Sequence, residues 1–246
     1  MNSEISQNIA EYTRLQKLCV ENIEALKNSL IGERLWIVGT GPSLVKQDVA
    51  RFESQNVIYL NNAIMLHEKV RPERAFSVIT DHIRLAELRA DASARSSVTT
   101  FCSTDKVLNP DVSSALFGTP LIFLMPKLTR TISAGKFAMG IDTHTGFSTD
   151  LIAGVYLGKT VLIPALQIAG HLGASEILLA GIDMTNSKGE YFSTDIRSHW
   201  NKFDYEKDAE GHLKVCVRNL NCGGASVKRE YALGSVDFLP ALSEVP

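Results

Sequence analysis

This chain of 246 residues has few cysteines, a small net charge and no long apolar run. The four cysteines, Cys19, Cys102, Cys216 and Cys222, lie far apart without a C-x-x-C pair, which predicts reduced thiols and argues against a disulfide framework or a zinc site. The formal net charge of −2 argues against nucleic acid as a partner. No apolar stretch approaches the roughly 20 residues that a membrane-spanning helix needs.

A secretory signal is also missing, because the amino terminus has no basic segment followed by an apolar core. We therefore expect a cytoplasmic protein with at most peripheral membrane association. Hydrophobic residues make up 45% of the chain, which at this length allows one domain to bury a large core. That the chain is a fragment of a larger protein stays open.

Short apolar runs, each about the length of a buried strand, recur along the chain. They lie at residues 35–38, 57–60, 76–79, 98–102, 121–124 and 177–180. Helical or irregular stretches separate them, and residues 161–172 predict a helix leading into the last run. This alternation predicts an α/β fold, in which a Rossmann-like, mostly parallel sheet has helices on both faces.

The segments before and between these apolar runs predict the remaining organisation of the chain. Apolar residues at helical spacing over 5–30 predict an N-terminal amphipathic helix, occupying residues 1–32, which would suit a homo-oligomer. The domain proper would be residues 33–246. Scattered glycines and threonines over 127–159 predict a long, partly irregular connection.

The carboxyl-terminal part of the chain is polar and aromatic over about 184–225, and this stretch predicts a small lid. Within it, the apolar residues at 213–217 predict a strand.

The loop Gly39-Thr40-Gly41-Pro42-Ser43 lies between a predicted strand and a predicted helix. Small residues, N–H groups and a hydroxyl at a helix N-terminus are what phosphate binding requires. Pro42 suits the first turn of a helix. The loop matches neither G-x-G-x-x-G nor the P-loop pattern, so a glycine turn that only permits tight packing stays the alternative.

Polar residues follow other predicted strands as well. Asn61 and Asn62 follow the second strand, Asp81 and His82 the third, and Asp183 the last. Ligands of open α/β sheets bind beyond the carboxyl ends of the strands, so we expect these residues to meet in one crevice. For each aspartate, a contact to a ribose hydroxyl and a structural cap both stay open.

Three stretches together resemble one family: residues 37–44 (IVGTGPSL), the Asn61-Asn62 step, and residues 158–183 (GKTVLIPALQIAGHLGASEILLAGID). They resemble the sialyltransferase-like family, which includes the bacterial sialyltransferases of glycosyltransferase family 42, related polysaccharide-biosynthesis proteins and 6-hydroxymethylpterin diphosphokinases. The resemblance implies a GT-A-type variant of the Rossmann-like fold. It also implies inverting, metal-independent transfer of an acidic sugar, sialic-acid-like or Kdo-like, from a CMP-sugar to a surface glycan or lipopolysaccharide.

The same resemblance implies a set of nucleotide contacts. They are Gly39, Thr40, Gly41, Pro42, Ser43, Asn61, Asn62, Asp81, Lys159, Thr160, Gly181 and Asp183. Thr40 stands where the sialyltransferases usually have asparagine. Their arginine near the sugar phosphate has no counterpart here, although Lys159 or Arg130 could serve.

Sugar transfer needs a base for the acceptor hydroxyl and a group that stabilises the departing phosphate. By resemblance, His199 is the candidate base and Tyr191 meets the leaving phosphate. His82 and His144 are alternative bases, and a purely structural role for His199 also stays open. The reaction requires no cofactor, and no histidine or carboxylate pair has the spacing of a helical zinc motif, so we assign no metal.

Two other functions fit the same residues. One is phosphotransfer of the diphosphokinase type, which would use ATP and magnesium. The other is a non-catalytic nucleotide-binding module of a glycan assembly complex. Metal-independent CMP binding, magnesium-dependent ATP binding, and binding without turnover distinguish the three.

Overall fold

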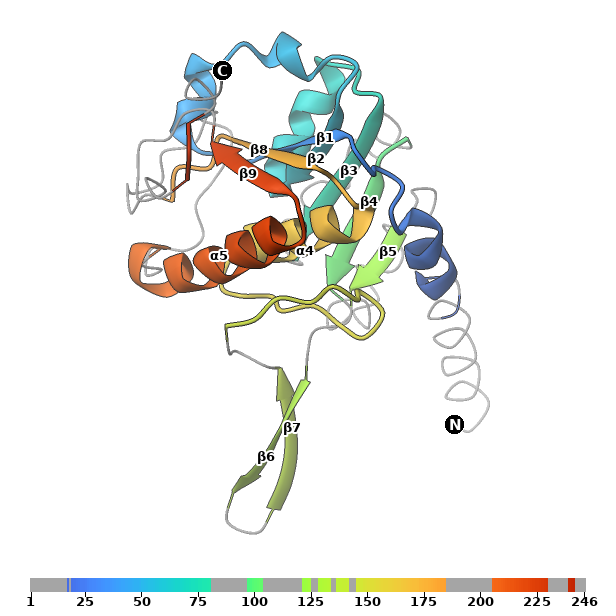
Figure 1. The fold of residues 1–246 in the computed structure, drawn as a ribbon, viewed down its shortest axis with the longest axis vertical. Coiled ribbons are helices and arrows are strands. Elements are labelled where there is room, and N and C mark those ends of the chain that lie inside the picture. The colour runs from blue at the N-terminus through green and yellow to red at the C-terminus, as the bar shows by residue number, and fades with distance from the viewer. Residues whose placement is uncertain are drawn as a thin grey trace, which may run out of the picture.

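In the part of the chain that the structure describes, a seven-stranded sheet lies at the centre, and all of its strand pairs are parallel (Figure 1). In spatial order the strands are β5 (Leu121–Leu124), β4 (Thr99–Ser103), β3 (Arg74–Ile79), β2 (Asn56–Leu60), β1 (Arg34–Val38), β8 (Glu176–Ala180) and β9 (Ser226–Arg229). The expected α/β, Rossmann-like fold is confirmed.

The computed structural model describes residues 17, 19–80, 97–103, 121–124, 128–133, 136–141, 145–184, 205–229 and 239–241. Among these residues no helix is long and apolar enough to cross a membrane.

Helices and 3-10 turns cover the two faces of the sheet. They are η1 (Pro42–Lys46), η2 (Val49–Phe52), η3 (Asn61–Glu68), α4 (Leu162–Leu172) and α5 (Tyr205–Cys222). Residues 19–26 form a further helix at the amino-terminal side of β1. The helix expected at residues 161–172 is therefore confirmed as α4.

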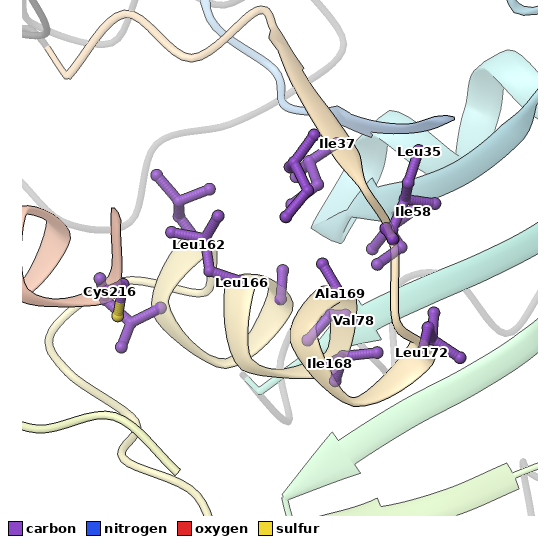
Figure 2. Packing of buried hydrophobic residues seen from close by; sticks show 14 of the residues in the cluster. Leu35, Ile37, Ile58, Val78, Leu162, Leu166, Ile168, Ala169, Leu172 and Cys216 are labelled. Carbon is purple, nitrogen blue, oxygen red and sulfur yellow. The ribbon is translucent and has the colours of Figure 1, made fainter. Parts of the chain in front are cut away.

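Two hydrophobic clusters pack on opposite faces of the sheet because successive strand residues point to opposite sides. Leu35 and Ile37 of β1 belong to the cluster under α4 and α5. Trp36 and Val38 belong to the cluster under the 3-10 turns. In Figure 2, α4 packs its buried apolar residues against the first face. Burial on both faces explains why the strands read as continuous apolar runs.

The expected strand at residues 213–217 is wrong, because these residues lie within α5. Ala209, Leu213, Cys216 and Leu220 are buried and recur every three or four residues, which is the spacing of one helix face. Burial raises the pKa of Cys216 to about 12, so this thiol is unreactive.

The expected lid over 184–225 is also wrong for its second half, since α5 packs against α4 and β9 extends the sheet. Residues 185–204 lie outside the described residues.

The connection expected at 127–159 is wrong in part as well. It contains an antiparallel hairpin, formed by β6 (Leu128–Ser133) and β7 (Lys136–Ile141). In Figure 1 this hairpin extends away from the seven-stranded sheet and the helices. Residues 145–161, which lead into α4, are irregular as expected.

The side chain of Gln167 in α4 holds part of this irregular stretch. Its Oε1 accepts from the backbone N–H groups of Ser148 and Tyr156, both at 3.0 Å. Its Nε2 donates to the carbonyls of Tyr156 at 2.7 Å and Ile163 at 3.0 Å. Gln167 is fully buried, so water cannot replace these four bonds without opening the loop.

The helix over residues 19–26 is tied to the end of α4. His171 hydrogen-bonds through Nε2 to the carbonyl of Ile23 at 2.8 Å, and the N–H of Asn28 donates to the carbonyl of His171. Ile23 and Leu30 belong to the main hydrophobic cluster. The described part of the N-terminal segment therefore shares the core of the sheet domain.

At the amino-terminal edge of the sheet, Glu176 is paired with two cations. Its carboxylate lies 2.6 Å from Arg34 Nε and 2.6 Å from Lys228 Nζ, which links β1, β8 and β9. The hydrogen bond from Lys228, helped by Arg34, lowers the pKa of Glu176 against the opposing effect of burial.

We expect Glu176→Gln to lower stability by about 1 kcal/mol at neutral pH, because the groups are partly exposed and screened by solvent. Since the folded pKa is lowered, this stabilisation is present above the unfolded pKa near 4.5 and is lost as pH falls through the folded pKa. Urea melts of the wild type and the variant should therefore differ at pH 7 and converge at the acid end. Glu24→Gln, on an exposed residue, is the control. An equal difference at both pH values would contradict the ion-pair account.

Candidate functional site

The carboxyl ends of β1 and β8 form the point at which the strand order reverses. From β1 the chain proceeds outward through β2, β3, β4 and β5 on one side, whereas β8 and β9 lie on the other. Adjacent loops diverge at such a point, and it is where open α/β sheets bind ligands. The polar residues that follow the strands are therefore expected to converge at this edge.

Three polar clusters come together there. Residues 39–43 follow β1, residues 61–62 follow the neighbouring β2, and residues 181–183 follow the neighbouring β8. Lys159 and Thr160 precede α4, which leads back into β8 and therefore begins at the same edge.

Of the other predicted site residues, only Arg130 is described. Arg130 lies on β6 in the separate hairpin, away from the edge formed by β1, β2 and β8. Five predictions lie outside the described residues: Asp81, His82, His144, Tyr191 and His199.

Close backbone approach explains the two glycines of the loop after β1. The N–H of Gly39 donates to Ala180 and that of Gly41 to Gly181, both at 2.8 Å. A Cβ on Gly39 would lie 2.5 Å from the carbonyl oxygen of Gly181. A Cβ on Gly41 would lie 2.2 Å from a carboxylate oxygen of Asp183. Only glycine fits at either position, so the tight-packing alternative is part of the explanation.

The N–H of Ser43, which a phosphate-binding loop would offer to the phosphate, is already used within the protein. It donates to Asp183 Oδ2 at 2.9 Å, and Asp183 is 2% exposed. The helix expected after the loop is the five-residue 3-10 turn η1, with Pro42 in its first turn as expected. A carboxylate thus occupies the N-terminal end of this turn, where a phosphate was expected, and like charges would repel. Asp183 acts here as the cap, although nucleotide contact by the loop stays a prediction.

Buried oxygen atoms that form no hydrogen bond with a described residue mark the same edge. They are Ser43 Oγ, Asn61 Oδ1 and Asn62 Oδ1. Ser43 is fully buried and Asn62 is 8% exposed. Asn61 has a φ of +49°, a left-handed conformation that asparagine tolerates better than most residues. Unsatisfied buried polar groups cost free energy, so a ligand that donates hydrogen bonds to these three acceptors would be stabilised.

The start of α4 is electropositive. No acidic residue lies in its first turn, and the exposed Lys159 precedes it. Thr160 Oγ1 accepts from the N–H of Leu162 at 3.4 Å. The helix dipole adds positive potential at this end, so an anion would be stabilised here.

His212 is a candidate that the sequence reasoning missed. It lies on α5 and is 7% exposed, and its buried Nδ1 has no hydrogen-bond partner among the described residues. Burial, and then the positive charge of Lys159, lower its pKa. A neutral imidazole with an unused nitrogen can accept a proton. The helical spacing of Ala209, Leu213 and Cys216 was the signal that could have placed His212 on a buried helix face.

The two other described histidines lie elsewhere. His171 is at the end of α4 and binds the backbone of Ile23. His67 packs edge-on against Tyr59 and hydrogen-bonds to Ser97, just before β4. His171 is therefore toward the amino-terminal edge of the sheet.

Two further features concern metal ligation and a hollow on α5. Within the described ranges, no group of three or more His, Cys, Asp or Glu residues is placed to hold a metal ion. A hollow of about 420 Å³ lies on the second half of α5, and Lys214, Val217, Arg218, Asn221 and Cys222 line it. That half of α5 leads toward the start of β9, at the opposite edge from the candidate site.

Comparison with known proteins yields no assignment: no protein-family model and no curated protein matches the chain.

Proposed function

We propose that this protein is a sialyltransferase-like glycosyltransferase that moves an acidic sugar from a CMP-sugar to a surface glycan or lipid-linked acceptor, with inversion and without a metal. The sequence resemblance over residues 37–44, 61–62 and 158–183 supports this proposal. These separate stretches are brought to one edge of a parallel sheet, at the reversal of strand order.

The observation that carries the proposal is the group of oxygens on Ser43, Asn61 and Asn62 that have no hydrogen-bond partner in the described part of the chain. Amide oxygens accept hydrogen bonds, and a nucleoside offers donors on its ribose hydroxyls and its exocyclic amine. We assign the nucleoside to this group. The loop N–H groups of Gly39, Gly41 and Ser43 are already bonded within the protein, so we assign the phosphate elsewhere.

The phosphate fits best at the start of α4. Lys159 and the helix dipole would stabilise the negative charge that develops as CMP departs. Thr160 would orient the phosphate through its hydroxyl. Tyr191, assigned to the leaving phosphate by resemblance, would add a donor from the following segment.

A histidine would accept the proton of the acceptor hydroxyl while that oxygen bonds to the anomeric carbon and the bond to the CMP oxygen breaks. His199 holds this role by resemblance. His212 is a second candidate, because it is buried, has an unused nitrogen and interacts with Lys159.

A thermal-shift screen tests the donor class. A ligand that binds only the native state raises the melting temperature, so CMP, CDP, UDP, GDP and ATP are compared with and without magnesium. We expect CMP or CDP to stabilise the protein without metal, followed by turnover of CMP-sialate or CMP-Kdo. Stabilisation only by ATP with magnesium would replace the proposal with the phosphotransferase, and CMP binding without turnover of any donor would favour the non-catalytic module.

Asn61→Gly should weaken CMP binding about tenfold, the worth of one hydrogen bond. Glycine keeps the left-handed backbone of Asn61 while removing its amide. Asn28→Gly is the matched control, because Asn28 also has a positive φ, of 59°, and lies at the opposite edge of the sheet. Titration calorimetry measures both affinities. Equal affinities for CMP in the two variants would remove Asn61 from the site.

A further inference from the structure

The β6–β7 hairpin is a two-stranded ribbon that pairs with no other described strand. Figure 1 shows it extending away from the body of the domain. Each strand has six residues, which corresponds to a reach of roughly 20 Å. An isolated hairpin is at best marginally stable in water unless one of its faces is covered. We therefore expect another surface to cover one face of this hairpin.

The register divides the hairpin into two unlike faces, because directly paired residues of an antiparallel ribbon share a face. One face holds the pairs Leu128↔Ile141, Arg130↔Met139 and Ile132↔Phe137. The other holds Thr129↔Gly140, Thr131↔Ala138 and Ser133↔Lys136. The first face is thus apolar in five of its six positions, whereas the second is made of small and polar residues with one lysine.

The charge of the hairpin has a single sign. Lys127, Arg130 and Lys136 are basic, and no acidic residue occurs from 127 to 141. The chain as a whole is net negative, so the basic character is local to this segment. An anionic partner is favoured by this charge, and an apolar one by the first face.

A second copy of the hairpin fits less well. Packing two apolar faces together would bring two Arg130 residues into the same contact, and like charges there are unfavourable.

From this placement we infer that the β6–β7 hairpin docks the protein on an anionic lipid surface. Its apolar face would lie at the boundary between headgroups and acyl chains, and its basic residues would meet lipid phosphates. The inference stands on the hairpin alone and does not depend on the proposed function. Three residues separate the carboxyl end of β5 from the start of β6, so the hairpin follows the outermost strand of the sheet, whereas the candidate site lies at β1 and β8.

Vesicle flotation of the full-length protein tests this inference. Vesicles of phosphatidylcholine alone are compared with vesicles of equal parts phosphatidylcholine and phosphatidylglycerol. We expect binding to the anionic vesicles only, weakening with added salt. Failure to bind anionic vesicles at low salt would overturn the inference. A dimer in solution that Phe137→Thr dissociates, without vesicle binding, would overturn it in favour of a second copy.

Two pairs of variants show whether binding belongs to the hairpin. Arg130→Gln combined with Lys136→Gln should weaken binding roughly 25-fold, about fivefold for each basic residue. The control combines Lys69→Gln with Arg218→Gln, which removes the same charge from exposed positions elsewhere and should leave binding unchanged.

Ile132→Thr combined with Phe137→Thr should also abolish most of the binding, because threonine keeps strand propensity and removes apolar area. Its control is Ile31→Thr, at an apolar residue that is 68% exposed on the body of the domain. Circular dichroism melts check that each variant folds. Equal losses in the hairpin variants and their controls would show that the hairpin is not the docking surface.

Discussion

Gln167→Leu should lower the free energy of unfolding by about 4 kcal/mol, a large part of the stability of a typical domain. Leucine has a similar volume, so the core stays filled. However, the N–H groups of Ser148 and Tyr156 and the carbonyl of Tyr156 lose the partner that Gln167 provides. Each buried group left unpaired costs about 1–3 kcal/mol, and partial opening of the loop recovers some of the total.

Urea denaturation measures this effect as a lower midpoint with an unchanged m-value. Gln55→Leu is the control, since Gln55 is half-buried between η2 and β2 and its side chain should contribute less than about 1 kcal/mol. A midpoint for Gln167→Leu as close to wild type as that of the control would mean that the loop does not depend on Gln167.

His212→Gln should reduce turnover by roughly 10²–10⁴-fold while CMP affinity stays near wild type, if the buried imidazole is the base. Glutamine keeps much of the volume and a hydrogen-bonding group, but it cannot take up a proton at neutral pH. Because the pKa of His212 is lowered below the usual 6.5, the imidazole is neutral at pH 7. The wild-type rate should therefore rise with pH through an apparent pKa below 6.5, and this limb should be absent from the variant.

His171→Gln is the matched control, because His171 is also a buried histidine but binds the backbone of Ile23 at the other edge of the sheet. It should lose stability and keep its turnover per folded molecule. A fully active His212→Gln protein would return the role of base to His199, His82 or His144.

Stability gives a second measurement of His212 that does not need the substrate. As pH falls below 6.5, the unfolded imidazole takes up a proton before the native one does, so the lowered pKa makes stability fall with pH. His212→Gln removes this contribution. Below pH 6.5, the stability of the wild type should therefore fall more steeply with falling pH than that of His212→Gln.

The strands could be predicted because each is a continuous apolar run ending in glycine or a polar residue. Residues 35–38, 57–60 and 177–180 became β1, β2 and β8 with small changes at their ends. Burial on both faces leaves a strong local signal, so no tertiary information was needed to find them. The order of the strands in the sheet could not be predicted in this way, because it depends on which strands pair.

α5 could not be predicted in the same way. Its apolar residues occur once per turn among charged ones, and the short run around residue 215 suggests a strand when read alone. The packing of Leu213 and Cys216 against α4 stabilises a helix here instead of a strand. The hairpin was missed for a related reason, since Arg130 interrupts its apolar alternation and it contributes no strand to the main sheet.

At the candidate site, the local sequence determined which residues follow the carboxyl end of each strand. Gly39, Gly41 and Asp183 could be recognised as strand-end residues, because each belongs to a short glycine-containing or polar stretch that directly follows an apolar run. Only the tertiary structure decided what they do to one another: Asp183, 140 positions from Ser43, accepts its N–H and fills the space that a Cβ on Gly41 would need. That contact depends on β1 and β8 becoming neighbours, and the pairing of distant strands is a property of the whole packed chain rather than of any one segment of it.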